Sequence, residues 1–382
     1  MDTCHNMEAY LDNSATTPPC LEAIAAMKNE LEHCWGNPSS LHSVGLKAEQ
    51  LLDQCRQTVA RSINCRPAEL VFTSGGTESN NLALLGAATA QTRRGRRIVT
   101  SAVEHSSIAE SAQGLEKRGF EVVYMDVDST GRVPEEELMR LINRDTILVS
   151  LMAVNNETGT IQPVEAIRRA VRHHQSPAVI HCDAVQSYGK LPIDPRKLGV
   201  DLLTVSAHKV HGPKGAGALY IRQGVRVLPI LYGGTQEHKL RPGTEAMPAI
   251  AGFAAAAAAI PDYNATLSYV SSLREHLVNG LRSISGVQLN SPADSLPYLT
   301  NLSVPGLQSE TMLNYLSARG VYVSSGSACG KGRKSPVLQA MGLSDAEVSG
   351  ALRISLSRFS TQEEIDLLLT TLAEACRILA RA

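Results

Sequence analysis

A lysine beside a glycine-rich turn is the clearest sign of chemistry in this sequence. Lys209 lies in the run Ser-Ala-His-Lys-Val-His-Gly-Pro-Lys-Gly-Ala-Gly, residues 206–217, just before the apolar stretch Ala218–Ile221. Glycines let a flat cofactor lie against the backbone, and a lysine amine can form a Schiff base with an aldehyde. The run therefore favours a pyridoxal phosphate site at Lys209. A surface lysine in a glycine-rich hairpin is the alternative that this run alone leaves open.

A second glycine turn could hold the phosphate of such a cofactor. The segment Ser74-Gly75-Gly76-Thr77-Glu78 ends a short apolar run and opens a helical stretch. Backbone N–H groups and the Thr77 hydroxyl at a helix N-terminus suit a phosphate group. An ordinary N-cap threonine fits the same residues. His105, which begins the next helical stretch after a strand, is either a site residue or a plain cap-region histidine.

Asp183 supplies the third part of this pattern. It follows an apolar strand at residues 178–182, and a carboxylate at a buried strand end needs a cationic partner. A protonated pyridine nitrogen is such a partner, and the pairing keeps the cofactor ring electron-withdrawing. Lys209 lies 26 residues further on, which is enough chain to return to the sheet and face Asp183. Together the three features are more specific than any one of them.

Strands and helices alternate along the middle of the chain, and this order predicts an α/β fold. Expected strands at residues 70–74, 97–101, 121–125, 146–152, 178–182 and 202–205 are separated by helical stretches at 77–90, 105–118, 134–142 and 164–173. The order indicates a largely parallel sheet with helices on both faces. After Pro261 long helical patterns predominate. We expect a large pyridoxal phosphate-binding domain at 16–261 and a smaller α+β domain formed by 1–15 and 262–382.

Composition narrows the class of protein. The chain has 382 residues, of which 43% are hydrophobic and 19% charged, with a net charge of −1, so nucleic-acid binding through a positive field is not expected. Met1–Tyr10 lacks a secretory pattern, and the apolar run Ala249–Ile260 is too short to cross a membrane. Eight cysteines without a Cys-x-x-Cys pair are typical of free thiols in a reducing compartment, so we expect a cytoplasmic enzyme without a metal site.

Motifs over nearly the whole chain resemble those of cysteine desulfurases of the NifS/IscS type, which are fold-type I pyridoxal phosphate enzymes of the class-V aminotransferase family. The matching segments are residues 10–18, 36–42, 72–81, 104–105, 154–159, 181–186, 206–220, 241–244, 324–329 and 353–355. The resemblance implies a mostly parallel seven-stranded sheet between helices, a homodimer, L-cysteine as substrate and a sulfur-acceptor protein as partner.

The resemblance also implies roles for single residues. Lys209 would form the Schiff base and shuttle protons, Cys329 would accept the sulfur, and His105 would stack on the ring and assist proton transfer. Asp183 would hold the pyridine nitrogen and Gln186 the phenolic oxygen. The phosphate would be bound by Gly76, Thr77, Ser206, His208 and, from the neighbouring subunit, Thr244. Asn155 and Arg353 would hold the substrate carboxylate, to which a planar guanidinium can donate two parallel hydrogen bonds.

Cys329 lies in a loop of small residues, Ser325-Gly-Ser-Ala-Cys-Gly-Lys-Gly. A buried structural thiol is the alternative, but Lys331, Arg333 and Lys334 nearby favour a thiolate through a lowered pKa. The implied reaction moves sulfur from cofactor-bound cysteine to Cys329, giving a persulfide and alanine. The persulfide would then serve iron–sulfur cluster assembly or thiolation.

Three other functions remain open at this point. A class-V aminotransferase would share Lys209 and Asp183 but would not need Cys329. A selenocysteine lyase would need less help from a thiolate, because selenium leaves more easily. A non-catalytic partner with the same fold is expected to lose Lys209, Asp183 or Arg353, and all three are present. The basic stretch after Cys329 is shorter than in housekeeping relatives, which leaves the sulfur acceptor open.

Overall fold

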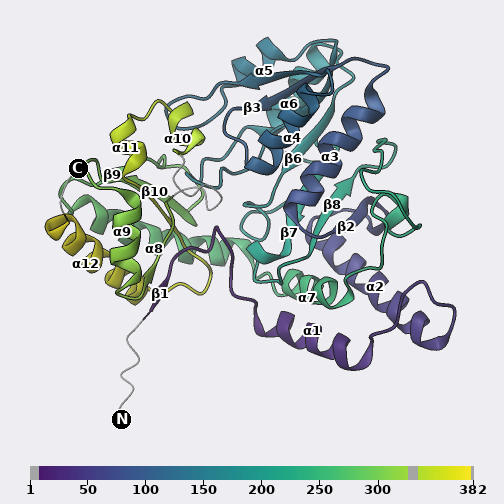
Figure 1. The fold of residues 1–382 in the computed structure, drawn as a ribbon, viewed down its shortest axis with the longest axis horizontal. Helices are drawn as coiled ribbons and strands as arrows, with labels where there is room; N and C mark the ends of the chain where they lie inside the picture. Colours follow the sequence, from purple (N-terminus) through teal and green to yellow (C-terminus); the bar gives the residue numbers. More distant parts are fainter. Residues whose placement is uncertain (1–7, 326–333, 380–382) are drawn as a thin grey trace.

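The computed structural model describes residues 8–325 and 334–379, and Figure 1 shows that they form two lobes of different size. Within these ranges the larger lobe is built on a seven-stranded sheet with the order β2-β8-β7-β6-β5-β3-β4. Its strands are β2 (Leu70–Thr73), β3 (Arg97–Ser101), β4 (Glu121–Met125), β5 (Thr146–Ser150), β6 (Val179–Asp183), β7 (Leu202–Ser206) and β8 (Gly217–Ile221). Strand β8 is antiparallel to both its neighbours, and the other pairs are parallel. The predicted α/β fold with a mostly parallel sheet is confirmed.

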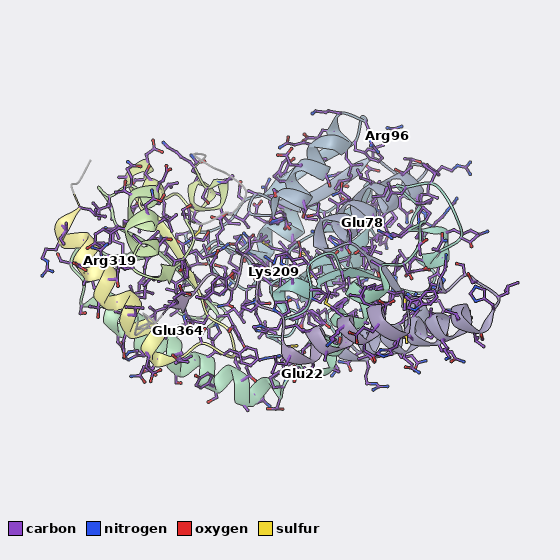
Figure 2. The ribbon with its side chains drawn as sticks, turned by 60° about the horizontal axis from the view of Figure 1, so that its bottom comes forward. Glu22, Glu78, Arg96, Lys209, Arg319 and Glu364 are labelled. Carbon is purple, nitrogen blue, oxygen red and sulfur yellow. The ribbon has the colours of Figure 1, made fainter. Side chains whose placement is uncertain are left out.

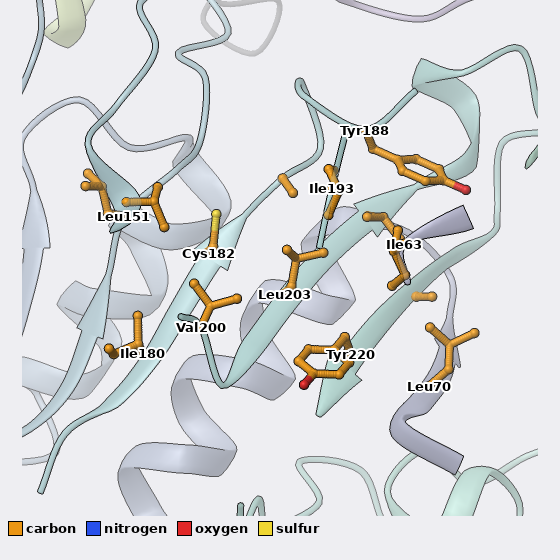
Figure 3. Packing of buried hydrophobic residues seen from close by; sticks show 14 of the residues in the cluster. Ile63, Leu70, Leu151, Ile180, Cys182, Tyr188, Ile193, Val200, Leu203 and Tyr220 are labelled. Atoms are coloured by element: carbon orange, nitrogen blue, oxygen red, sulfur yellow. The ribbon is translucent and has the colours of Figure 1, made fainter. Parts of the chain in front are cut away.

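Helices cover both faces of this sheet, as continuous apolar strands require. One face packs against α3 (Gly76–Gln91) and α4 (Ser106–Glu116). The other packs against α2 (Ser43–Ser62), α5 (Glu135–Leu141), α6 (Val164–His173) and α7 (Met247–Ala258), while α1 (Leu21–His33) lies on α7. Neighbouring residues of one strand separate to opposite faces: Leu219 packs toward α3, and Tyr220 points into the cluster that Figure 3 shows. The core therefore has two layers, one on each side of the sheet.

The smaller lobe contains a three-stranded antiparallel sheet. Strand β10 (Leu299–Ser303) lies between β9 (Gln288–Leu289) and β12 (Ala351–Ser355). Around it lie α8 (Tyr263–Arg282), α9 (Ser309–Ser317), α10 (Pro336–Ala340), α11 (Asp345–Ser349) and α12 (Gln362–Ile378). Strand β1 (Ala9–Tyr10) pairs in parallel with β11 (Val321–Tyr322), and Ala9 and Leu11 are buried in the core of this lobe. The domain boundaries at 15/16 and 261/262 stay a prediction.

Several element bounds differ by one or two residues from the sequence-based expectations, and two of these differences lie near His105. Helix α4 begins at Ser106 because His105 is its N-cap, with a side chain that accepts a hydrogen bond from the backbone N–H of Ser107. Strand β5 ends at Ser150, two residues before the expected end, because the backbone N–H of Met152 donates to the side chain of Glu104 and no longer to a strand. In the part of the chain that the structure describes, no helix combines the length and the hydrophobicity that a bilayer span requires.

Candidate active site

A cavity of about 490 Å³ lies where the carboxyl ends of the central strands face the smaller lobe. Figure 2 shows Lys209 near the middle of the molecule, between the two lobes. The predicted residues that line the cavity are Gly76, Thr77, His105, Asp183, Gln186, Ser206, His208, Lys209 and Arg353. Open α/β sheets bind ligands at this edge, because parallel strands end there together.

The turn after β2 forms a cradle suited to a phosphate group. Gly75 has a φ of +151°, and a Cβ atom at Gly76 would come within 2.9 Å of a Val185 methyl group. Both positions therefore favour glycine. The hydroxyl of Ser206 is fully buried beside this turn and has no hydrogen-bond partner among the described residues. Thr77 adds a hydroxyl at the N-terminus of α3, where the helix dipole attracts anions.

His208 lies on the same side of the cavity, with its Nδ1 3.3 Å from the hydroxyl of Thr16. Burial and, to a smaller extent, the nearby charges of Lys209 and Lys214 lower the pKa of His208 to about 4. The imidazole is therefore neutral near pH 7 and serves as a hydrogen-bonding group without a charge of its own.

Asp183 is held at the end of β6 by two hydrogen bonds. Its Oδ2 accepts from Asn80 Nδ2 at 2.7 Å, and its Oδ1 accepts from the backbone N–H of Val185 at 2.9 Å. Asp183 is 5% exposed, and no ion pair joins it to a cationic side chain within residues 8–325 and 334–379. A buried carboxylate in this setting fits a protonated ring nitrogen.

Hydrogen bonds continue from Asp183 to His105. Asn80 Nδ2 also donates to Ser107 Oγ at 2.8 Å, and that hydroxyl lies 2.9 Å from His105 Nδ1. Burial lowers the pKa of His105, and the charges of Lys209 and Arg353 add to the shift while Asp183 opposes it. Nδ1 accepts from the Ser107 backbone N–H, so the neutral ring carries its proton on Nε2.

The N-terminal segment contributes backbone oxygens to the cavity. The Lys209 Nζ donates to the carbonyl oxygens of Ser14 and, at 2.8 Å, of Ala15. Gln186 Nε2 donates to the same Ser14 oxygen at 3.1 Å. Lys209 therefore lies directly against Ser14 and Ala15, which belong to the matched motif at residues 10–18 but carried no predicted role.

Arg353 reaches the cavity from β12 of the smaller lobe and is 2% exposed. Its Nη1 donates to the carbonyl oxygen of Asn156 at 3.0 Å, and its Nη2 donates to Asp12 Oδ1 at 2.8 Å. Its Nε is buried and has no partner among the described residues. This guanidinium can take a further acceptor, as a substrate carboxylate would be.

Asn155 does not line the cavity. Its Oδ1 accepts from the backbone N–H groups of Glu157 and Thr158, and its Nδ2 donates to the Val103 carbonyl oxygen at 3.0 Å. Its neighbour Asn156 does line the cavity, and the Oδ1 of Asn156 is buried without a partner in the described part of the chain. The structure thus places Asn156, and not Asn155, in the lining of the cavity, while a contact of Asn155 with the substrate carboxylate stays a prediction.

Thr244 and Cys329 are the remaining predicted residues. Thr244 is exposed and does not line this cavity. Cys329 lies outside the described residues, together with Lys331 and Arg333. Lys334 is described, and its Nζ lies 2.7 Å from Asp345 Oδ1 on the surface of the smaller lobe.

The sequence-based reading missed Asn80 and Ser107. Both carried a usable signal, because Asn80 lies one helical turn after Thr77, and Ser107 lies in the first turn after His105. Residues at this spacing share one face of a helix, and here that face looks onto the end of β6.

Comparisons with known proteins agree with this geometry. The chain matches the aminotransferase class-V family over residues 9–368. The cysteine desulfurase IscS of Methanosarcina thermophila is 42% identical over 376 residues, which cover 97% of this chain and 92% of that protein. A solved NifS-like protein has a TM-score of 0.92 at 40% identity, covering 98% of this chain and all of the other. SspA, solved in complex with cysteine, has a TM-score of 0.82 at 33% identity, covering 92% of this chain and 100% of its own.

The chain therefore belongs to the class-V aminotransferase family and, within it, to the cysteine desulfurases. Its cofactor is pyridoxal phosphate. The buried Ser206 hydroxyl, the glycine cradle and the lone Asp183 carboxylate all fit this group.

Proposed function

We propose that two walls of the cavity share the cysteine desulfurase reaction. The chain is a cysteine desulfurase, which removes sulfur from L-cysteine and leaves L-alanine. The cofactor wall consists of Gly76, Thr77, His105, Asp183, Gln186, Ser206, His208 and Lys209. The substrate wall consists of Asn156, Glu157 and Arg353. The observation that carries the proposal is that Lys209, Asp183 and Arg353, from two lobes, line one cavity.

The cofactor wall binds and orients the cofactor. Pyridoxal phosphate, when bound, withdraws electrons from the carbon that carries the substrate amine. The α3 N-terminus, with Thr77, Ser206 and His208, would hold the phosphate. Asp183 would hold the pyridine nitrogen and Gln186 the phenolic oxygen, and the neutral ring of His105 would stack on the cofactor ring. Lys209 would anchor the cofactor through Nζ and move protons at the substrate.

The substrate wall binds the carboxylate of cysteine. Arg353 Nε faces no acceptor among the described residues, and burial makes such a donor costly to leave without one. A carboxylate oxygen on this Nε satisfies the donor, while Asp12 continues to orient the guanidinium through Nη2. The Asn156 amide gives the same carboxylate a second contact.

The sulfur leaves through Cys329. The Cys329 thiolate attacks the substrate sulfur, a new S–S bond forms, and the C–S bond breaks with its electron pair left on the carbon. A proton then completes alanine, and Cys329 holds the sulfur as a persulfide. The reciprocal backbone hydrogen bonds of Ser324 and Arg353 support this proposal, because they tie the segment that leads to Cys329 to the substrate wall. Two of the other cysteines are poor nucleophiles, since burial raises the pKa of Cys55 to about 11 and that of Cys182 well above its usual value.

We propose that the enzyme is a cytoplasmic homodimer. Large apolar side chains are exposed on α1, on α2 and between them, among them Leu21 at 81%, Leu31 at 60%, Trp35 at 69% and Leu41 fully exposed. A second copy would remove such a patch from water. Thr244, exposed outside its own cavity, is then available to the phosphate of the neighbouring subunit. The persulfide passes to an acceptor protein for iron–sulfur cluster assembly or thiolation.

The experiment is the release of sulfide and alanine from L-cysteine with a reductant, for the wild type beside Cys329→Ala. We expect equal amounts of both products from the wild type and only background from the variant, since nothing then attacks the sulfur. Full turnover by Cys329→Ala would overturn the role of Cys329. Cleavage of selenocysteine alone would favour the selenocysteine lyase, and transamination without sulfide would favour the aminotransferase.

A further inference from the structure

Lys190 is a buried lysine to which the proposed mechanism assigns no role. It is 6% exposed and lies in the helical turn after β6, where its backbone N–H donates to the Ser187 carbonyl oxygen. Its Nζ lies 5.6 Å from the centre of the Tyr298 ring, and it forms no ion pair with a carboxylate among the described residues. Burial and, to a smaller extent, the charges of Lys209 and Arg353 lower its pKa to about 7. Burying an amine without a carboxylate partner costs free energy, which a hydrophobic residue at this position would avoid.

One hydrogen bond connects Lys190 to the cofactor wall. Its Nζ donates to Gln186 Oε1 at 3.1 Å, while the Gln186 Nε2 donates to the Ser14 carbonyl oxygen at 3.1 Å. A lysine nitrogen near a carbonyl group acts as a donor, and a backbone carbonyl only accepts, so the two partners together fix which end of the amide is which. The Gln186 N–H₂ group therefore faces the side of the cavity where Lys209 lies.

The Ser14 carbonyl oxygen alone fixes the orientation of the Gln186 amide less firmly, because it also accepts from Lys209. The Gln186 N–H₂ group has two N–H donors, so it can donate to a phenolic oxygen as well as to Ser14, and Lys190 is the partner of its Oε1 among the described residues. Without Lys190 the amide could rotate and present an oxygen to an oxygen, which is repulsive.

We propose that Lys190 is a positioning residue for the cofactor: it holds the Gln186 amide so that Nε2 donates to the phenolic oxygen. The inference rests on the proposed role of Gln186 and deepens it. The Gln186 Nε2 donor would withdraw negative charge from the phenolic oxygen. Negative charge on that oxygen would otherwise favour a proton on the nitrogen that Lys209 contributes. Loss of the donor therefore strengthens proton binding at that nitrogen.

The test is a pH titration of the cofactor absorbance in the holoenzyme. Lys190→Met keeps the length of the stem and removes the donor. We expect the titration midpoint to move upward by about one pH unit. Gln186→Leu should give a similar upward shift. Lys197→Met, an exposed lysine later in the same connection, is the matched control and should leave the midpoint unchanged.

The double variant separates action through Gln186 from other effects. In Gln186→Leu, the further change Lys190→Met should add no shift, because its target is absent. Equal shifts from Lys190→Met in both backgrounds would mean that its charge acts directly and would overturn the inference. A shift in Gln186→Leu with none in Lys190→Met would also overturn it, while the proposed function stands.

Failure of the proposed function looks different. If Gln186→Leu alone leaves the midpoint unchanged, Gln186 does not contact the phenolic oxygen, and the proposed cofactor contact is wrong. If Lys190→Met does not fold, Lys190→Gln takes its place, since its shorter side chain cannot reach Gln186 Oε1 and the same upward shift is expected. The melting temperature of each variant shows that the comparison is made on folded protein.

Discussion

The two walls of the cavity are built in different ways. The cofactor wall comes from the ends of β2, β3, β6 and β7 of one sheet and the segments that follow them. Two side chains outside the wall, Asn80 and Ser107, link its Asp183 to His105 through hydrogen bonds. The substrate wall joins Arg353 of β12 to Asn156 and Glu157, which follow β5 in the chain. Asp12 from the N-terminal segment orients Arg353. Part of one wall is thus a hydrogen-bonded network within the larger lobe, and the other wall depends on how separate chain segments meet. Changes at Arg353 should therefore disturb substrate binding more than cofactor binding.

The strongest test of the cofactor wall is Lys209→Ala. We expect alanine formation to fall by at least about 10³-fold, because the variant loses both the covalent anchor and the proton carrier. In the wild type, borohydride should fix the cofactor onto the Lys209 peptide. Lys197→Ala is the control and should keep full activity. A variant that retains turnover and borohydride labelling would place the anchor on another lysine.

Arg353→Lys tests the substrate wall separately. The change keeps the charge but removes the planar fork, so one hydrogen bond to the carboxylate is lost. At about 1.5–3 kcal/mol for a hydrogen bond to a charged group, the KM for cysteine should rise about tenfold or more. The cofactor absorbance should stay intact, and Arg319→Lys, in the turn after α9, should match the wild type. Loss of cofactor with an unchanged KM would mean that Arg353 supports cofactor binding and does not bind the substrate carboxylate.

Asn156→Ala and Asn155→Ala test which of the two asparagines contacts the substrate. Asn156→Ala should raise the KM severalfold with little change in melting temperature. Asn155→Ala leaves the buried N–H groups of Glu157 and Thr158 without their acceptor and should lower the free energy of unfolding by about 1–3 kcal/mol. Steady-state kinetics and thermal melts of both variants check this, and the reverse pattern would restore Asn155 as the substrate contact.

The smallest effect concerns His211, just after Lys209. Burial lowers its pKa to about 4, below the unfolded value near 6.5, so its contribution to stability is full above about pH 6.5 and is lost as the pH falls toward 4. His211 has a φ of +66°, which asparagine tolerates. His211→Asn should reduce the stability lost between pH 7 and 4 by about 1–2 kcal/mol. Chemical denaturation at the two pH values measures this, and an unchanged loss would assign it to other groups.

The positions of the residues in the cofactor wall could be predicted from the sequence, because they follow from the strand that precedes each residue. Parallel strands end at one edge, so a carboxylate at Asp183 and a lysine at Lys209 had to approach each other. The Ser206 and Thr77 hydroxyls follow from the same rule. These placements agree with the cavity lining, while the chemical roles of the residues stay a prediction.

The substrate wall and Lys190 could not be predicted, because they depend on contacts that residue spacing does not encode. Asn155 and Asn156 are adjacent and identical, and only the loop geometry decides which side chain enters the cavity. Lys190 reads as an ordinary loop lysine until its burial is known. Asp12 is 341 residues from Arg353, and no periodicity connects them. The role of Cys329 and the dimer stay predictions.

The path of the N-terminal segment has a consequence for protein engineering. After β1 joins the smaller lobe, Asn13 and Ser14 bond to Ser355, and a few atoms later Ser14 and Ala15 offer their carbonyl oxygens to the Lys209 amine. A displacement of either lobe therefore reaches that amine through backbone alone, without a layer of side chains to absorb it. Substitutions far from the cavity that tilt β1 can then move the Lys209 amine, and libraries that leave this strand out would miss them.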